Sequence, residues 1–241
     1  MSTSMLCDML RELRSLLFPP RCMVCGVCTT PTMQGICPKC RFDIPLTYWW
    51  LKDDNPTKSR FDGLIPIVHG SSFFTYKGRS QWAQLIGRFK YGGKWRFAHT
   101  LGLWYGSELK ASGLYDDIDV IVPVPLHAVK LIKRGYNQSR YLAEGMAEAM
   151  GIAVDARSVV RVRNNPSQAK RKANERWHNV DDLFAIRHPE RLSNKHILVV
   201  DDVLTSGATL YACLSAIHSA LPDCRLSVAT LAVSEYISAI R

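Results

Sequence analysis

The chain has 241 residues, enough for one medium-sized domain with a small module beside it and for a sizeable buried core. Hydrophobic residues make up 47% and charged residues 22%, as in a soluble globular protein, and no run of 18 apolar residues occurs that would span a membrane. The formal net charge of +10 favours anionic partners such as phosphates, nucleotides or nucleic acid, although many basic proteins bind no nucleic acid.

Residues 1–19 are predicted to form an amphipathic helix. Leucine and methionine side chains recur there between Asp8, Arg11, Glu12 and Arg14, and these charges interrupt the apolar core that a signal peptide requires. We therefore expect a cytoplasmic protein whose first helix packs on the body, with weak membrane contact as the alternative.

Residues 20–58 are predicted to form a metal-binding module because five cysteines are concentrated there. Cys22 and Cys25 form one Cys-x-x-Cys pair and Cys37 and Cys40 form another, a pattern in which four thiolates surround one tetrahedral Zn²⁺. Cys28 forms a second such pair with Cys25, so it is either a substitute ligand or a bystander. Four thiolates leave no open coordination position, so the zinc is expected to be structural; reduced free thiols are the alternative.

Residues 59–241 are predicted to form an α/β domain with a mainly parallel sheet, because strand–helix–strand crossovers give parallel sheets whose sites lie at the carboxyl ends of the strands. The expected strands are a pair at 65–69 and 72–76, a buried strand at 118–125 and a strand at 225–233. Helices are expected around Trp82–Phe89 and over 138–150.

Two basic segments lie between these elements. The first follows the strand at 118–125 and contains His127, Lys130, Lys133 and Arg134, and the second is residues 161–179. Pyrophosphate carries several charges and requires guanidinium, ammonium or backbone N–H partners, which such loops supply. The alternative for the second segment is a solvated basic loop that promotes solubility.

Residues 197–209 carry the clearest sign of a binding site. The buried strand Ile197–Val200 is followed by Asp201 and Asp202 and then by a loop that is rich in hydroxyl groups and leads into a helix. The unpaired N–H groups and the dipole at a helix start favour an anion, and Gly207 lets the backbone approach it closely. The acids would then face sugar hydroxyls or a divalent ion; the alternative is that they only cap a helix and end a strand.

This run resembles the 5-phosphoribosyl-1-pyrophosphate (PRPP) motif of type I phosphoribosyltransferases, with Ser206 where a second threonine is usual. Three further segments are similar to the ComF/GntX group of phosphoribosyltransferase-like proteins: Phe89–Lys94, the sequence from Pro123 to Gln138, and a segment that contains Pro166, Gln168, Arg176, Asn179, Val180 and Phe184. The resemblance implies a type I phosphoribosyltransferase-like fold with an amino-terminal zinc ribbon, and hood elements at about residues 60–110.

The resemblance also implies roles for individual residues. Asp201 and Asp202 would be the catalytic acids that hold the ribose hydroxyls or the water shell of Mg²⁺, which binds together with PRPP. The 5′-phosphate would lie in the loop of Thr205, Ser206, Gly207, Ala208 and Thr209, and the pyrophosphate would contact Arg134, Lys170, Arg171 and Lys172.

Two functions follow from this resemblance. The first is Mg²⁺-dependent displacement of pyrophosphate from PRPP by an acceptor that no residue identifies. The second is that of a ComF-type competence protein, which binds single-stranded DNA during natural transformation, works with the DNA-uptake machinery and uses the PRPP fold for binding or regulation. Pyrophosphate release distinguishes the first from the second.

Overall fold

The computed structural model describes residues 19–89, 95–163 and 183–235. The chain divides into two compact units, Met1–Ile44 and Pro45–Arg241. The helix expected over residues 1–19 lies almost entirely outside the described residues, as do Lys90, Lys94, Lys170, Arg171 and Lys172.

The first unit is small and has a core made largely of cysteine. A bridge joins Arg21 to Cys28 in antiparallel fashion, and the short elements that follow are the 3-10 helix η1 (Pro31–Met33) and the helix α2 (Pro38–Phe42). From residue 19 onward, its buried hydrophobic residues are Cys22, Val24, Ile36, Cys37, Cys40 and Ile44. So few apolar side chains provide little free energy of folding, which is typical of a module stabilised by a metal.

The second unit begins with a segment that packs on its own sheet. This segment contains η2 (Trp49–Leu51) and α3 (Pro56–Ser59). Trp50 is 1% exposed, and its ring lies 5.6 Å from that of Phe73 and 6.0 Å from that of Tyr105. Residues 45–58, which the sequence analysis groups with the metal module, therefore pack within the second unit.

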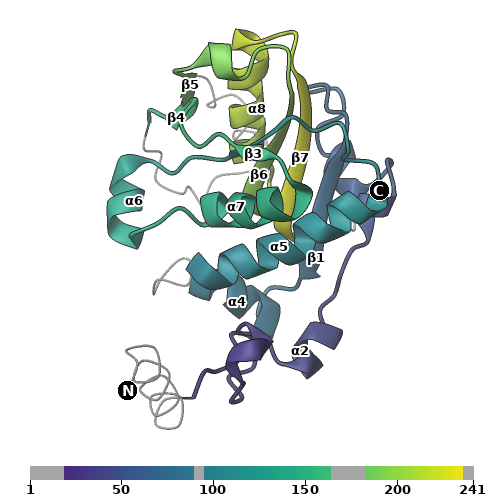
Figure 1. Ribbon diagram of the computed structural model, residues 1–241. Helices are drawn as coiled ribbons and strands as arrows, with labels where there is room; N and C mark the ends of the chain where they lie inside the picture. Colours follow the sequence, from purple (N-terminus) through teal and green to yellow (C-terminus); the bar gives the residue numbers. More distant parts are fainter. Residues whose placement is uncertain (1–18, 90–94, 164–182, 236–241) are drawn as a thin grey trace, which may run out of the picture. The chain divides into compact units, whose positions relative to one another are not determined.

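A five-stranded sheet forms the centre of the second unit (Figure 1). Its strands are β1 (Gly70–Tyr76), β2 (Val120–Pro123), β3 (Ala153–Val154), β6 (His196–Leu204) and β7 (Arg225–Ser234). Their order is β1-β7-β6-β2-β3, and every neighbouring pair is parallel. The predicted α/β fold with a parallel sheet is confirmed. All five carboxyl ends consequently meet at one edge of the sheet.

Helices cover both faces of this sheet. The helices after β1 are α4 (Gln81–Phe89), α5 (Trp95–Ser112), α6 (Ala128–Arg134), α7 (Gln138–Met150) and α8 (Ala208–Ala220). Of these, α5, α7 and α8 contact strands of the sheet, whereas α6 buries none of its residues. Successive side chains of a strand point to opposite faces. Ile197 and Val199 of β6 share a core with Leu214 of α8, so α8 covers that face; α7 packs against β2 and β6, with α5 along it.

A separate antiparallel pair, β4 (Val159–Arg161) and β5 (Phe184–Ile186), lies beside α8, and the 3-10 helix η4 (Pro189–Arg191) follows it. No helix in the described ranges is both long enough and apolar enough to cross a membrane.

One predicted strand pair is wrong. Residues 65–69 form no strand, although 70–76 do. Val68 donates its backbone N–H to Leu226, and β1 continues along the same neighbour, β7, so the two segments follow one another instead of pairing. Pro66 has no backbone N–H, which is consistent with a ladder that starts only after it.

Candidate functional site

The acid pair lies inside β6 near its carboxyl end, because the strand continues past Asp201 and Asp202 to Leu204. The Oδ1 atom of Asp201 accepts a hydrogen bond of 2.9 Å from Ser139 Oγ and one of 2.8 Å from the backbone N–H of Asp202. Ser139 belongs to the first turn of α7, so this contact joins the start of α7 to the end of β6.

The acid pair is electrostatically strained. Burial, together with the adjacent Asp202 carboxylate, raises the pKa of Asp201 to about 8. Burial also raises the pKa of Tyr76 at the end of β1, and the Asp202 charge adds to this shift. Two carboxylates that repel one another beside buried groups favour a bound cation or hydroxyl donors, which would stabilise the ionised form.

The predicted phosphate loop joins β6 to α8 at the same edge. Gly207 has φ +84° and ψ −8°, a left-handed conformation that other residues rarely adopt, and α8 starts at Ala208. The N–H of Ala208 lies 3.4 Å from Ser206 Oγ. The first turn lies at the positive end of a 13-residue helix, a position that favours an anion.

Arg60 holds this loop from outside the motif. Its Nε and Nη2 atoms donate hydrogen bonds of 3.0 and 2.9 Å to the carbonyl oxygen of Ser206. The Cγ atom of Arg60 lies 3.4 Å from the position that a Cβ on Gly207 would take. Sequence reasoning missed Arg60, because no local pattern connects residues that are 146 positions apart.

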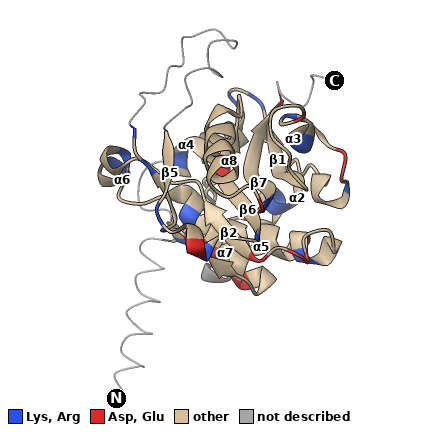
Figure 2. Cartoon of the chain, turned by 90° about the horizontal axis from the view of Figure 1, so that it is seen from above, with Lys and Arg blue, Asp and Glu red and all other residues tan. Residues whose placement is uncertain are grey.

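The loop between β2 and α7 reaches the same edge. Asn137 caps α7 and donates from Nδ2 to the carbonyl of Val124 at 3.1 Å, and Val124 in turn donates its N–H to Val200 at 2.8 Å. Arg134 ends α6 and donates from Nη1 to Gln138 Oε1 at 3.2 Å. His127, a weaker candidate from the sequence, caps α6 through Nδ1. The basic residues of α6 are the blue parts of that helix in Figure 2.

The four cysteines predicted as metal ligands come together in the first unit. The Sγ atoms of Cys22, Cys25, Cys37 and Cys40 all lie within 4.8 Å of one another. The sulfur atoms of Cys25 and Cys37 are 3.7 Å apart, and a tetrahedral site with Zn–S bonds of about 2.3 Å requires a separation of roughly 3.8 Å. Cys28 is exposed and lies outside the cluster.

The surroundings of these four thiols favour a bound metal cation. Burial opposes ionisation of Cys22, but hydrogen bonds from the backbone N–H groups of Cys25, Cys37 and Val24 lower its pKa to about 6. Burial raises the pKa of Cys40 far above its ordinary value, and the neighbouring cysteines raise it further. The cluster therefore holds one thiolate readily, and a positive ion is required for all four to ionise.

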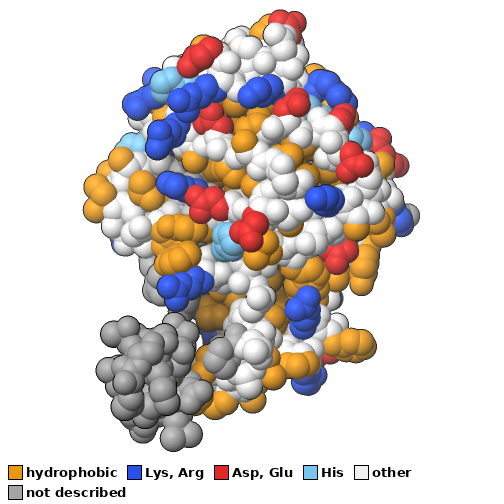
Figure 3. Space-filling view, in the orientation of Figure 1, with side chains coloured by type: hydrophobic (Ala, Val, Ile, Leu, Met, Phe, Trp, Pro, Cys, Tyr) orange, Lys and Arg blue, Asp and Glu red, His pale blue; other side chains and the backbone are white. Residues whose placement is uncertain are grey.

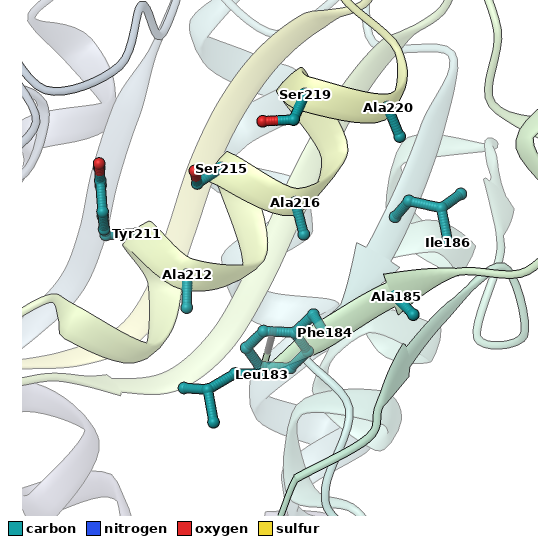
Figure 4. Close-up of a pocket in the computed structure, with 10 residues that line it drawn as sticks. All are labelled: Leu183, Phe184, Ala185, Ile186, Tyr211, Ala212, Ser215, Ala216, Ser219 and Ala220. Carbon is teal, nitrogen blue, oxygen red and sulfur yellow. The ribbon is translucent and has the colours of Figure 1, made fainter. Parts of the chain in front are cut away.

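A cavity of about 560 Å³ lies between α8 and β5 (Figure 4). Its polar lining consists of side-chain hydroxyls of α8, those of Tyr211, Ser215 and Ser219, and the rest is apolar, including Leu183 and Phe184. Among the residues that the structure describes, its lining includes no charged side chain, neither acid of the pair and no phosphate-loop residue. A second cavity, of about 480 Å³, adjoins the loop between β2 and α7.

The structure thus brings Asp201, Asp202 and the phosphate loop to the edge where the β2–α7 loop also ends. Lys170, Arg171 and Lys172 lie outside the described residues. Arg161, on β4, is a second residue that sequence reasoning did not single out: its charge acts on Asp201, and its guanidinium lies 5.4 Å from the ring of Phe184.

No family model matches the chain. Over 201 residues it is 27% identical to the DNA utilization protein YhgH of Escherichia coli (strain K12), a match that covers 78% of this chain and 80% of that protein. It is 25% identical over 190 residues to the competence protein ComFC of Bacillus subtilis (strain 168), a match that covers 78% of this chain and 68% of that protein. A 36% identical match to YhgH of Salmonella typhi covers 92 residues, which is 38% of this chain and 40% of that relative.

Solved structures align with part of the chain. The adenine phosphoribosyltransferase of Saccharomyces cerevisiae covers 64% of this chain and 76% of its own at 14% identity, with a TM-score of 0.39. The alignment with the glutamine PRPP amidotransferase of Bacillus subtilis covers 54% of this chain and 26% of that one, at 18% identity and with a TM-score of 0.36. These alignments are partial, so the sheet order and the loops described above define the fold.

Proposed function

The chain belongs to the ComF/GntX family of phosphoribosyltransferase-like proteins, and we propose that it binds PRPP together with Mg²⁺ and displaces pyrophosphate from it. One observation supports this proposal above all: a carboxylate pair inside a buried strand is followed directly by a glycine-capped helix start, at the edge where parallel strands end. An anion site and an acid site are therefore adjacent, as a phosphorylated sugar requires.

The phosphate loop would bind the 5′-phosphate of PRPP. Thr205, Ser206 and Thr209 supply hydroxyls, and the backbone N–H groups around Gly207 and Ala208 donate at the positive end of α8. Because Arg60 already holds the Ser206 carbonyl, the loop would need little rearrangement on binding.

Asp201 and Asp202 would orient the ribose. Ser139 fixes Oδ1 of Asp201, which leaves Oδ2 and the Asp202 carboxylate to accept from the 2′- and 3′-hydroxyls or from metal-bound water. The pair fits Mg²⁺, because this ion prefers one or two carboxylate ligands plus substrate oxygens. When bound, Mg²⁺ neutralises charge on the leaving pyrophosphate. Ionised acids beside the ribose would also stabilise a transition state with oxocarbenium character.

Arg134 would contact the pyrophosphate from the loop between β2 and α7, and Lys170, Arg171 and Lys172 would approach it from the second basic segment. Guanidinium and ammonium groups suit a multiply charged leaving group. In the first unit, we assign Zn²⁺ to the four-cysteine cluster in a structural role, since four thiolates leave no position for a substrate.

The experiment is isothermal titration of PRPP with Mg²⁺ into wild type and into the Asp201→Asn, Asp202→Asn double variant. The double variant is expected to lose at least tenfold in affinity, since each charge-assisted hydrogen bond contributes about 1.5–3 kcal/mol. A matched control replaces two exposed acids at the opposite edge of the sheet, Asp116→Asn with Asp223→Asn. Equal affinity in wild type and the acid-pair variant would refute the proposal.

A second candidate function, single-stranded DNA handling, is favoured by an aromatic and basic surface at the start of α5. Trp95 is 39% exposed, the guanidinium of Arg96 lies 5.0 Å from its ring centroid, and the ring of Tyr141 lies 5.2 Å away. Exposed aromatic rings beside cations bind bases by stacking, independently of sequence. Basic side chains also gather over the region of β4 and β5 (Figure 3).

Fluorescence anisotropy with a labelled oligothymidylate, measured at several salt concentrations, tests this second function. Affinity is expected to fall steeply with salt, and Trp95→Ala is expected to weaken binding about tenfold because one stacked base contributes about 1–3 kcal/mol. Trp95→Phe retains an aromatic ring and serves as the control. Pyrophosphate release without DNA binding would support the transferase alone.

A further inference from the structure

The cavity of about 480 Å³ beside the β2–α7 loop combines an apolar wall with charged side chains. It is lined by prolines and aliphatic residues of the β2 end, α6 and β4, among them Pro125, Leu131 and Val160. The aromatic rings of Tyr136 and Tyr141, 5.9 Å apart in an edge-to-face arrangement, form another wall. Arg140 and Arg161 complete the lining. This volume is in the range of small-molecule sites.

Asn137 and Tyr136, two polar residues of this cavity, are already engaged. Asn137 Oδ1 accepts the N–H of Ser139 at 3.2 Å, and its Nδ2 donates to Val124. The hydroxyl of Tyr136 donates to the backbone carbonyl of Phe89. The charged side chains of the lining, Arg140 and Arg161, are both donors, and the hydroxyl of Tyr141 can donate or accept.

Arg161 is the main charged group of the cavity. It is partly buried, and burial lowers its pKa although the Asp201 charge opposes that shift. Its Nε donates to the carbonyl oxygen of Arg163 at 3.4 Å, and its guanidinium lies 5.4 Å from the ring of Phe184. The two terminal nitrogens are the atoms that could donate to a ligand. Among the described residues it forms no ion pair, whereas Arg140 is bound through Nε to Glu144 at 2.8 Å. A partly desolvated guanidinium without a carboxylate partner at contact distance favours an anionic ligand.

We propose that this cavity binds a small amphipathic anion: a flat apolar body that carries one carboxylate or phosphate group. The tyrosine rings and the aliphatic wall bury the body, and the guanidinium of Arg161 binds the anionic group in a bidentate manner. A neutral nucleobase fits less well, because it would leave the charge of Arg161 without an anionic partner. The lining contains no residue of the phosphate loop, but it shares the β2–α7 loop with the proposed pyrophosphate contact.

The experiment is isothermal titration of the full chain with 2-naphthoate and with its uncharged analogue 2-naphthamide. The naphthoate is expected to bind one per chain and at least tenfold more tightly than the amide, because a charge-assisted hydrogen bond contributes about 1.5–3 kcal/mol. Titration with 2-naphthyl phosphate distinguishes the two anionic groups; whichever binds more tightly identifies the preferred one. Equal affinities for naphthoate and naphthamide, or no binding of either anion, would overturn the proposal.

Three variants locate the site. Arg161→Gln is expected to weaken naphthoate binding at least tenfold, whereas Arg157→Gln, an exposed arginine outside the cavity, leaves it unchanged. Ala156→Phe fills the cavity from an exposed position without removing charge, so it is expected to abolish binding in a chain that still folds. Unchanged binding to Ala156→Phe would place the ligand elsewhere. Displacement of bound naphthoate by inorganic pyrophosphate would show that the cavity is only part of a pyrophosphate site, which also contradicts the proposal.

Discussion

The guanidinium of Arg60 donates two hydrogen bonds to the carbonyl oxygen of Ser206, at 3.0 and 2.9 Å. In a trans peptide the carbonyl and the following N–H point in opposite directions within one plane. By fixing the Ser206 carbonyl, Arg60 therefore fixes the direction of the Gly207 N–H, which is one of the donors at the start of α8. It also places a positive charge beside the proposed phosphate site.

We expect Arg60→Gln to weaken PRPP binding about tenfold or more, because two charge-assisted hydrogen bonds and one positive charge are lost. Arg60→Lys keeps the charge but loses the two-pronged contact, so its affinity should lie between those of wild type and Arg60→Gln. Isothermal titration measures both. Arg225→Gln, an exposed arginine that starts β7 at the opposite edge of the sheet, is the control; an equal loss in that variant would mean that only net charge matters.

The acid pair predicts a pH-dependent stability in the absence of ligands. The pKa of Asp201 is raised to about 8 by burial and by Asp202, whereas its unfolded value is about 3.9. The folded state then holds a proton that the unfolded state has lost, so the free energy of unfolding falls as the pH rises from about 4 to about 8. Asp201→Asn cannot titrate, yet its Oδ1 still accepts from Ser139 and Asp202.

Urea unfolding at pH 5, 7 and 9 tests this. Asp201→Asn should exceed wild type in free energy of unfolding by about 2 kcal/mol or more at pH 9, and the difference should shrink towards pH 5. Asp116→Asn, at an exposed position, should follow the wild-type profile. Parallel profiles for Asp201→Asn and wild type would contradict the raised pKa.

Local patterns predicted the central part of the site, because four buried apolar residues, two acids and a glycine-containing loop lie within 13 consecutive positions. The same patterns could not predict Arg60 or Ser139, whose partners lie 146 and 62 positions away and are set by how the chain folds. The error at residues 65–69 has a similar origin: an apolar run was read as a pairing strand, but its neighbour is the distant β7.

The metal site can be tested independently of function. Cys40→Ser is expected to release stoichiometric zinc, because one of four ligands is lost and folding of the small first unit depends on the metal. Cys28→Ser, outside the cluster, should retain zinc. Metal content by mass spectrometry measures both. The second unit has its own sheet, so PRPP affinity in Cys40→Ser should change less than about twofold; abolished PRPP binding would mean that the first unit is part of the site.

Two glycine-to-alanine substitutions in helices are expected to have opposite effects on stability. Gly145 lies where α7 packs closely on α5, and a Cβ there would come within 2.1 Å of the carbonyl oxygen of His99 and 2.8 Å of the Leu103 nitrogen. Those are backbone atoms of a packed helix, so Gly145→Ala must push α5 and α7 apart. We expect a loss of about 1–3 kcal/mol in the free energy of unfolding.

Gly87 supplies the matched control, because it is exposed in α4 and a Cβ there would meet nothing within 4 Å. Alanine loses less conformational entropy than glycine on helix formation, so Gly87→Ala should gain about 0.5–1 kcal/mol. Urea unfolding of both variants and wild type under the same conditions measures the two differences. If Gly145→Ala were as stable as wild type, α5 and α7 would not be in the close contact described here, and Ser139 in the first turn of α7 would lack the rigid support that holds it against Asp201.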